Sequence, residues 1–261
     1  MTTLHMIHTG KTGGSAIKRA LRTSGYAYWH EPDAAGTTPT PYGPVQLHNH
    51  RFPLSQVPPD HYAFFFMRDP IKRFISGFYS RLDQGRPRYD FPWSENERKA
   101  FEAFPTPQSL AAALAGDDPE QRALAEWSMG QIGHLGFQRR RLGPPAKIRE
   151  RLDQIVYIGR QETLDDDWEK LKSILEIRAD VELPTDPVLA HRRVDDDRDK
   201  TLDKAAKRAL REWYARDYKL LKFCEEVRLE RGWAKPPAPR PKKAPSPPKS
   251  LPARLRAKLR A

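Results

Sequence analysis

The apolar segment His61–Met67 and the residues that follow it restrict the fold more than any other feature of the sequence. From Tyr62 on, the segment is apolar without interruption, which is typical of a parallel strand covered on both faces. Asp69 can cap a following helix, and Pro70 suits the first turn of that helix. Apolar residues then recur at helical spacing, at Ile71, Phe74, Ile75, Phe78 and Leu82. A buried strand that leads directly into an amphipathic helix predicts an α/β fold.

Other segments repeat this alternation of strand and helix. Residues 4–8 and 155–158 are predicted to be buried strands, and helices are predicted to follow them over 16–21 and 164–175. Residues 201 to about 231 are predicted to form one long amphipathic helix. Prolines interrupt residues 85–150, which predicts several short helices there, including 109–114 and 120–127. Strands separated by helices imply a central parallel sheet.

The positive charge is concentrated at the end of the chain. The 261 residues include 46 Lys and Arg against 34 Asp and Glu, a formal net charge of +12. Residues 234–261 hold nine of these cations, no acid and eight of the 25 prolines. The remaining 37 cations nearly balance the acids, and we predict that residues 1–233 form a single domain. Residues 234–261 cannot bury enough apolar surface to offset chain entropy, so a disordered tail is expected.

Several classes of protein are excluded by composition. The single cysteine, Cys224, allows neither an intrachain disulfide nor a cysteine-based metal site. No uncharged apolar run approaches the ~18 residues that a transmembrane helix needs. The first predicted strand begins so close to Met1 that no room is left for a signal peptide. We therefore expect a soluble, cytoplasmic protein.

The glycine-rich segment His8–Ser15 lies between the first predicted strand and its helix. A turn that feeds a helix N-terminus directs free backbone N–H groups at one point, where the helix dipole also favours an anion. Gly13 and Gly14 allow the backbone to approach a phosphate closely, and Lys11 adds a cation. The segment differs from a Walker A motif because its lysine precedes the paired glycines. The alternative is an ordinary turn between strand and helix.

A second candidate anion site follows the strand that ends at Met67. Arg68 lies at the carboxyl end of that strand, where ligands bind in open α/β sheets. Ser76 lies about two helical turns further on and, with Arg73, on a different face from the apolar residues. An arginine and a hydroxyl that converge at a strand end can hold a phosphate. Alternatively, Arg68 forms an ion pair with Asp69 or another acid.

Together these segments resemble the sulfotransferases that use 3′-phosphoadenosine 5′-phosphosulfate (PAPS), in particular the carbohydrate-type branch that contains the heparan sulfate 2-O-sulfotransferases. That family's first loop reads like His-Ile-Pro-Lys-Thr-Gly-Gly-Thr-Ser, which is similar to His8–Ala16. Its second motif, Arg-Asp-Pro with a later Arg and Ser, is similar to Arg68–Ser76. A third stretch resembles Gly159–Glu162 followed by Asp167–Leu171, and the likeness extends over roughly 4–225. Gly10, Ser15 and Ala16 stand where the family usually has Pro, Thr and Ser.

The resemblance implies a three-layer P-loop-like fold and a sulfuryl transfer from PAPS to a hydroxyl group, on a small molecule or glycan and most simply a carbohydrate. It implies that the 5′-phosphosulfate is bound by Lys11, Thr12, Gly13, Gly14 and Ser15. Arg68 and Ser76 would bind the 3′-phosphate, and Lys11 would also stabilise charge on the departing phosphate oxygen. No metal is required.

The acceptor side is indicated by His48-Asn49-His50. In the similar branch the second histidine of such a segment is the base, a role that corresponds to His50. A neutral imidazole with a pKa near ~6.5 can take a proton from an attacking hydroxyl. Alternatively, His48 and His50 are surface or structural residues, or His48 is the base. A zinc pair lacks an obvious third ligand, and His-Asn-His alone is too short to indicate a nuclease.

The sequence also permits other interpretations of its motifs and of the tail. A P-loop kinase or NTPase would also use the first loop, but it needs a carboxylate for Mg²⁺, for which Asp69 is the obvious candidate. Arg139–Arg141 can face an acidic acceptor or simply the solvent, and His191–Arg193 falls where the family has a loop over the nucleotide. The tail can contact an anionic membrane or another polyanion, without sequence-specific nucleic acid binding, or serve only as a solubilising segment. On an anionic membrane the end of the tail would form a short basic helix, with Leu251, Leu255 and Leu259 on its apolar side.

Overall fold

The computed structural model describes residues 2–28, 38–186, 188 and 197–234, and the strands among them form one parallel sheet. The strand order is β2-β3-β1-β4-β5. Their bounds are β1 Leu4–Ile7, β2 Ala27–Tyr28, β3 Val45–Leu47, β4 Tyr62–Met67 and β5 Ile155–Arg160. The predicted central parallel sheet is confirmed, although the two short strands β2 and β3 were not predicted.

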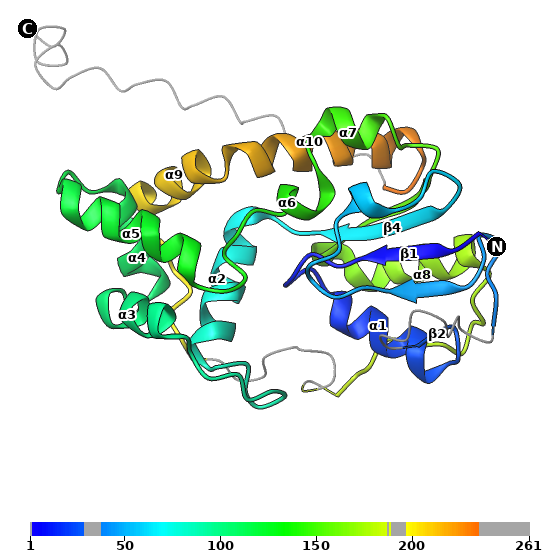
Figure 1. The fold of residues 1–261 in the computed structure, drawn as a ribbon, viewed down its shortest axis with the longest axis horizontal. Helices are drawn as coiled ribbons and strands as arrows, with labels where there is room; N and C mark the ends of the chain where they lie inside the picture. The colour runs from blue at the N-terminus through cyan, green and yellow to red at the C-terminus, as the bar shows by residue number, and fades with distance from the viewer. Residues whose placement is uncertain (1, 29–37, 187, 189–196, 235–261) are drawn as a thin grey trace, which may run out of the picture.

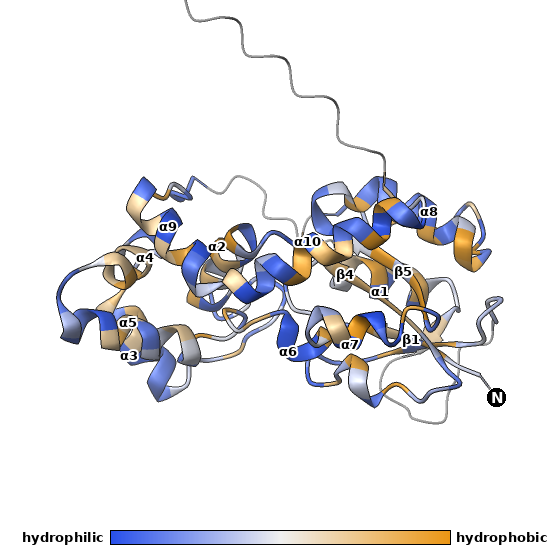
Figure 2. Cartoon of the chain, turned by 90° about the horizontal axis from the view of Figure 1, so that it is seen from above, coloured by the Kyte–Doolittle hydropathy of each residue, from blue (hydrophilic) through white to orange (hydrophobic). Residues whose placement is uncertain are grey.

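Helices cover both faces of this sheet and complete three layers (Figure 1). Helices α1 (Gly14–Thr23) and α8 (Leu164–Leu175) pack on one face, while α7 (Pro145–Arg149) and α10 (Ala215–Glu230) pack on the other. Strand β4 serves both layers, since Phe64 and Phe66 point into one core and Phe65 into the other. This two-sided burial explains why the strand is apolar throughout. Figure 2 shows the hydrophobic strands β4 and β5 between more polar helices.

A second group of helices has a core of its own beside the sheet (Figure 1). It comprises α2 (Pro70–Leu82), α3 (Glu95–Ala103), α4 (Pro107–Ala115), α5 (Pro119–Gln131) and α9 (Lys204–Trp213). The short helices predicted at 109–114 and 120–127 lie within α4 and α5. Along the chain, α6 (Arg139–Leu142) lies between α5 and α7. Single 3-10 turns occur at Leu54–Gln56 and Gln161–Thr163. The sequence predicted α2 and the short helices within α4 and α5, but it did not predict the bounds of α3 and α9 or the separate core of this group.

The start of α2 is built as predicted. The Asp69 side chain accepts a hydrogen bond from the backbone N–H of Lys72 at 2.9 Å, and Pro70 is the first helical residue. Phe74 and Phe78 are fully buried, as the apolar spacing requires. Arg73 lies on another face, also as predicted, but it is only 5% exposed. Its burial has a specific cause in the site described below.

The prediction of one long helix from 201 to about 231 is wrong. The chain breaks at Tyr214, which ends α9 and precedes α10. The Tyr214 ring is fully buried, and its hydroxyl donates to the Leu135 carbonyl at 2.6 Å. The break lets α9 pack in the helical core and α10 on the sheet, which one straight helix could not do.

Some predictions lie beyond the described residues. The loop His191–Arg193 and all of the tail except Ala234 fall there, so the tail and the domain boundary stay predictions. Across the described part of the chain, no helix combines the length and apolarity that a membrane crossing requires. The cytoplasmic location also stays a prediction.

Candidate functional site

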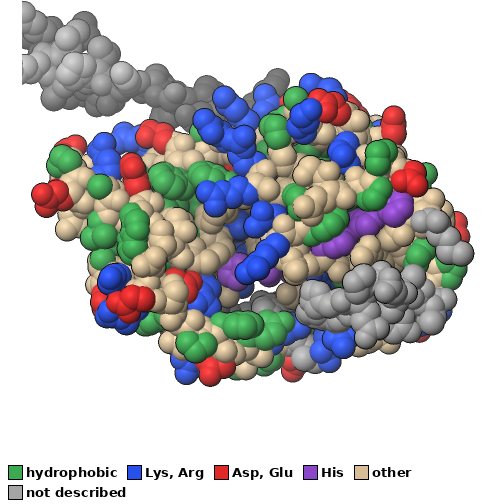
Figure 3. Space-filling model, in the orientation of Figure 1, with side chains coloured by type: hydrophobic (Ala, Val, Ile, Leu, Met, Phe, Trp, Pro, Cys, Tyr) green, Lys and Arg blue, Asp and Glu red, His purple; other side chains and the backbone are tan. Residues whose placement is uncertain are grey.

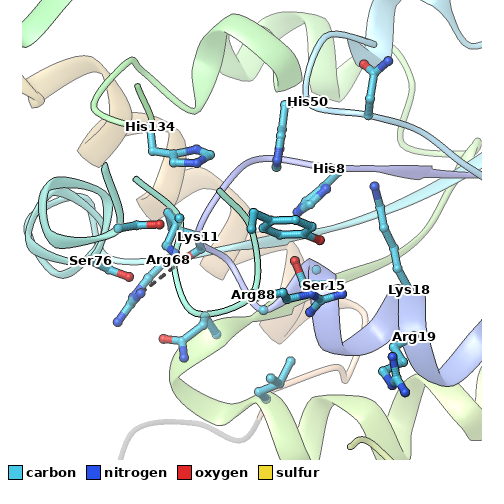
Figure 4. Close-up of a pocket in the computed structure, with 18 of the residues that line it drawn as sticks. His8, Lys11, Ser15, Lys18, Arg19, His50, Arg68, Ser76, Arg88 and His134 are labelled. Atoms are coloured by element: carbon cyan, nitrogen blue, oxygen red, sulfur yellow. Dashed lines mark hydrogen bonds between the residues drawn. The ribbon is translucent and has the colours of Figure 1, made fainter. Parts of the chain in front are cut away.

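The carboxyl ends of four parallel strands meet at one cavity. His8 follows β1, Asn49 and His50 follow β3, Arg68 follows β4 and Gln161 follows β5, and all line a cavity of about 660 Å³. Parallel strands direct their carboxyl ends to the same edge of a sheet, which is where open α/β folds bind ligands. In Figure 4, Arg68 and Ser76 lie together at one side, His50 and His8 at another, and Lys11 between them.

The N-terminus of α1 is open to an anion. Gly13 precedes the helix with φ of 85°, no side chain caps the first turn, and no acidic residue lies in it. A Cβ at Gly14 would come within 2.5 Å of the His8 ring, so this position requires glycine. Lys11, Gly13, Gly14 and Ser15 all line the cavity. The structure thus brings together these residues of the predicted phosphosulfate loop.

Thr12 is placed differently from its neighbours. Its hydroxyl is buried and donates to the Thr9 carbonyl at 2.7 Å, inside the loop. The Thr9 hydroxyl in turn donates to the carbonyl of Phe66 in β4 at 2.9 Å. Thr12 therefore shapes the loop with its side chain, and only its backbone remains to meet a ligand.

Arg68 joins the second candidate site to the first. Its Nη1 donates to the Lys11 carbonyl at 3.2 Å, which places the two predicted anion sites in contact. The Gln138 side chain fixes the Arg68 backbone, accepting from its N–H at 3.1 Å and donating to its carbonyl at 2.8 Å. The Arg68 Nε is buried and has no hydrogen-bond partner among the residues that the structure describes. Burial lowers the pKa of Arg68 from its ordinary value.

The alternative ion pair between Arg68 and Asp69 does not form within the described part of the chain. Asp69 Oδ1 caps α2 and Oδ2 accepts from the Tyr218 hydroxyl at 3.2 Å. Glu162, the other nearby acid, accepts from the Asp69 backbone N–H at 2.8 Å and pairs with Arg160 at 2.8 Å. The commitment of Asp69 to α2 also weakens its candidacy as a Mg²⁺ ligand.

Arg73 ties three segments of the site together. Its Nε donates to the Gly10 carbonyl at 2.8 Å and its Nη1 to the Gly136 carbonyl at 2.6 Å. These bonds hold the first loop and the 132–138 connection against α2. A buried guanidinium with such partners is structurally fixed.

The two candidate histidines have separate environments. His48 stacks on Phe52, with ring centroids 3.6 Å apart, and its Nε2 is hydrogen-bonded to His5. His50 lines the cavity and lies against His8 and His134, with ring centroids 4.1 Å and 5.3 Å away. The geometry therefore favours His50 over His48 as the residue that meets a ligand.

His50 is kept neutral by its surroundings. Its ring is open to the cavity, but the protein enclosing it withdraws bulk water, and the charges of Lys18, Arg73 and Lys11 add to this effect. Together they lower the pKa of His50 to about 4, while a hydrogen bond with the His8 backbone acts in the opposite direction. A neutral ring at physiological pH can accept a proton.

The cavity is strongly cationic. Its described lining contains no Asp or Glu, and Figure 3 shows Lys and Arg side chains gathered around the hollow between the helical core and the sheet. Arg81 is neutralised by Glu97 at 2.7 Å. The Lys and Arg residues of the lining are Lys11, Lys18, Arg19, Arg22, Arg68, Arg81 and Arg88. Such a surface selects a ligand with several negative charges.

Comparison with known proteins assigns this arrangement to a family. The sequence model of the Sulfotransferase family matches residues 3–224, which span nearly the whole described fold. This chain belongs to the sulfotransferase family. It is therefore a transferase, and sulfuryl transfer is favoured over the phosphoryl transfer of a P-loop kinase or NTPase. A search of curated proteins found no match.

The third stretch that resembles the family, residues 159–162 and 167–171, holds together the elements next to the site. In this sulfotransferase, Glu162 holds the Asp69 backbone, as described above. The buried Asp167 accepts from the Arg160 backbone at 2.8 Å and pairs with Arg228 of α10 at 2.9 Å. These contacts connect β5, α8 and α10 rather than line the cavity.

Several cavity residues were not predicted from the sequence, and two of them, His134 and Lys18, contact the predicted segments. His134 lies in the connection between α5 and α6, so close to the first loop that a Cβ at Gly10 would come within 2.6 Å of its ring. Lys18 lies on α1, is 6% exposed, and donates to the His48 carbonyl. Burial lowers the pKa of Lys18 to about 8. His134 belongs to no recognised motif, and Lys18 falls just after the glycine-rich segment rather than within it.

The other predicted positions fall away from the cavity lining. Arg139 and Arg140 line a separate surface hollow with Trp213, and Arg141 donates to the His50 carbonyl. Within the described residues, no cluster of His, Cys, Asp and Glu is suited to a metal ion.

Proposed function

We propose that this sulfotransferase moves a sulfuryl group from PAPS to a hydroxyl acceptor. The observation that carries the proposal is the contact between Arg68 and the Lys11 carbonyl, which joins two anion sites in a cavity whose described lining contains no acid. PAPS carries a 5′-phosphosulfate and a separate 3′-phosphate, and therefore needs two such sites. The buried Arg68 Nε, which lacks a partner among the described residues, fits a phosphate oxygen as its acceptor.

The placement of the donor-binding residues supports the roles proposed for them. The backbone from Thr12 to Ser15, with Gly13 and Gly14 at the start of α1, would hold the 5′-phosphosulfate. Lys11 would stabilise the negative charge that develops on the phosphate side. Arg68 and Ser76, which share one side of the cavity, would hold the 3′-phosphate.

PAPS supplies an activated sulfuryl group on a phosphate leaving group. His50 would take the proton of the acceptor hydroxyl on its exposed ring, since its lowered pKa keeps it neutral. The hydrogen bond to the His8 backbone orients that ring. We further propose a carbohydrate as the acceptor, on the basis of the resemblance to the carbohydrate-type branch. No metal has an assigned role in this scheme.

Calorimetry with adenosine 3′,5′-bisphosphate and ATP tests the proposal. We expect tighter binding of the bisphosphate, independent of Mg²⁺, because Arg68 and Ser76 recognise the 3′-phosphate. Equal affinity, or an ATP preference that depends on Mg²⁺, would overturn it in favour of a kinase or NTPase. Screening hydroxyl acceptors with labelled PAPS would then identify the acceptor.

A contact between the basic tail and a polyanion is a separate proposal, supported by nine cations without an acid in residues 234–261. Full-length protein is compared with a chain ending at Trp233 for binding to anionic vesicles. Binding that disappears on truncation and fades with salt would support it. Unchanged binding after truncation would eliminate it.

A further inference from the structure

A buried histidine of β1 has no part in the chemistry proposed above. His5 is 4% exposed and lies between β3 and β4 in the sheet. Its Nδ1 is hydrogen-bonded to His48 Nε2 at 2.8 Å, and its Nε2 to His61 Nδ1 at 2.8 Å. The three rings form a chain from the residue after β3 to the residue before β4. Figure 3 shows histidine side chains in a row over the sheet, apart from the central hollow.

This chain of histidines is satisfied when all three rings are neutral. A neutral imidazole has one donor and one acceptor, so His5 can donate to one neighbour and accept from the other. Burial, and then the nearby His61, lower the pKa of His5 to about 4. The His5 ring is therefore neutral at physiological pH, and the chain of hydrogen bonds is complete.

The chain ends at the segment that carries His50. The His48 ring is held from one side by His5 and from the other by the stacked Phe52. The His48 carbonyl accepts from Lys18 of α1, and the His50 carbonyl accepts from Arg141 of α6. Only Asn49 separates the anchored His48 from His50, so the placement of one restricts the other.

We propose that His5 is a positioning residue for His50, which it holds in the cavity through its Nδ1 hydrogen bond to His48. This inference rests on the proposed role of His50 as the base. It gives the two ring nitrogens of His5 different roles. The Nδ1 bond to His48 matters for His50, whereas the Nε2 bond to His61 anchors the far end.

Two substitutions separate these nitrogens. The amide of His5→Asn lies where Nδ1 was and can keep the bond to His48, while the amide of His5→Gln lies near the Nε2 position and can keep the bond to His61. Asparagine is the smaller side chain and leaves the larger cavity. A purely structural role for His5 therefore predicts that His5→Asn is the more disruptive variant. The positioning role predicts the opposite order.

The readout is the pH titration of the His50 ring, followed by NMR with ¹⁵N-labelled histidine and assigned from the spectrum of His50→Asn. In the native protein its midpoint is expected at about 4. We expect His5→Gln to shift it toward the ordinary value of ~6.5, because the ring leaves its enclosed position, and His5→Asn to leave it within about half a unit. Besides burial of the ring, the charged groups that lower this midpoint are Lys18, Arg73 and Lys11, and the titratable His134 lies against the ring.

A shift in both variants, in neither, or in His5→Asn alone would overturn the inference. Binding of adenosine 3′,5′-bisphosphate is measured in parallel, and both variants should retain native affinity within about twofold, since the phosphate sites are built from other residues. Failure of the native protein to bind this nucleotide would instead refute the proposed function. The two failures are therefore distinguishable.

Discussion

Replacing Arg68 by alanine should weaken binding of the donor's 3′-phosphate more than binding of its 5′-phosphate. Among the described residues, the guanidinium makes one hydrogen bond, from Nη1 to the Lys11 carbonyl, and its Nε has no partner. The proposed 3′-phosphate would satisfy that Nε. Arg68→Ala therefore removes one contact that supports the first loop and at least one that only a 3′-phosphate uses.

The expected magnitudes follow from these two kinds of contact. A hydrogen bond between charged groups contributes about 1.5–3 kcal/mol, so the affinity for adenosine 3′,5′-bisphosphate should fall by an additional ~10- to ~150-fold relative to 5′-AMP. Loss of the bond to the Lys11 carbonyl costs about 1 kcal/mol, which weakens both nucleotides by roughly fivefold. The ratio of the two affinities isolates the first effect from the second.

Calorimetry of both nucleotides with native protein, Arg68→Ala and Arg19→Ala provides the measurement. Arg19 also lines the cavity but lies on α1, so Arg19→Ala removes the same charge without touching the proposed 3′-phosphate site. It should weaken both nucleotides by similar small factors. If Arg68→Ala weakens 5′-AMP as much as the bisphosphate, the assignment of Arg68 to the 3′-phosphate is refuted.

Three further outcomes are expected. Arg73→Met leaves the carbonyls of Gly10 and Gly136 without their donor, and should lower the free energy of unfolding by about 2–4 kcal/mol in urea titrations; a loss below about 0.5 kcal/mol would contradict the role given to those bonds. His50→Asn should abolish turnover yet preserve nucleotide binding, and the native kcat/KM for PAPS, which reports ionisations of the free protein, should hold from pH 7 to about 5 and decline toward the lowered pKa of about 4; a decline centred near ~6.5 would argue against an enclosed base. The folded-state pKa of His5, about 4, lies below its unfolded value, so the unfolded chain binds more protons between these values. Stability should therefore fall as the pH drops from ~6.5 toward 4, and this dependence should weaken in His5→Asn.

The parts of the molecule that could be predicted from sequence are those specified locally. The two-sided burial of Phe64 and Phe65, the Asp69 cap and the glycines of the first loop each depend on neighbours in the chain. Their placement at one edge then follows from the parallel sheet. For this reason the predicted phosphate residues reach the same cavity, with Thr12 the exception that uses its hydroxyl inside the loop.

The parts that could not be predicted depend on contacts between distant segments. His134 reaches the first loop from a connection between helices, and Gln138 fixes the Arg68 backbone from 70 residues away. The break at Tyr214 occurs because the apolar residues before it pack in the helical core, whereas those after it pack on the sheet. Periodicity reports that a face is apolar, but it does not report which core the face will join.

The way the buried cations are satisfied explains how the site can remain strongly positive. Lys18, Arg68 and Arg73 each donate to a main-chain carbonyl, of His48, Lys11 and Gly10 respectively. A carbonyl completes the hydrogen bond of a buried cation but does not cancel its charge, whereas a carboxylate would do both.

The nearby acids are engaged by other partners. Glu162 and Asp167 pair with Arg160 and Arg228, and Asp217 accepts from the backbone of Gln138 at 2.7 Å. The carbonyls therefore satisfy ordered cations without cancelling their charge. Burial, and then the charges of Lys18, Arg73 and Lys11, lower the pKa of His50. A donor with several negative charges would compensate those charges when it binds, which would raise the pKa of His50 and make it a stronger base in the complex than in the free protein.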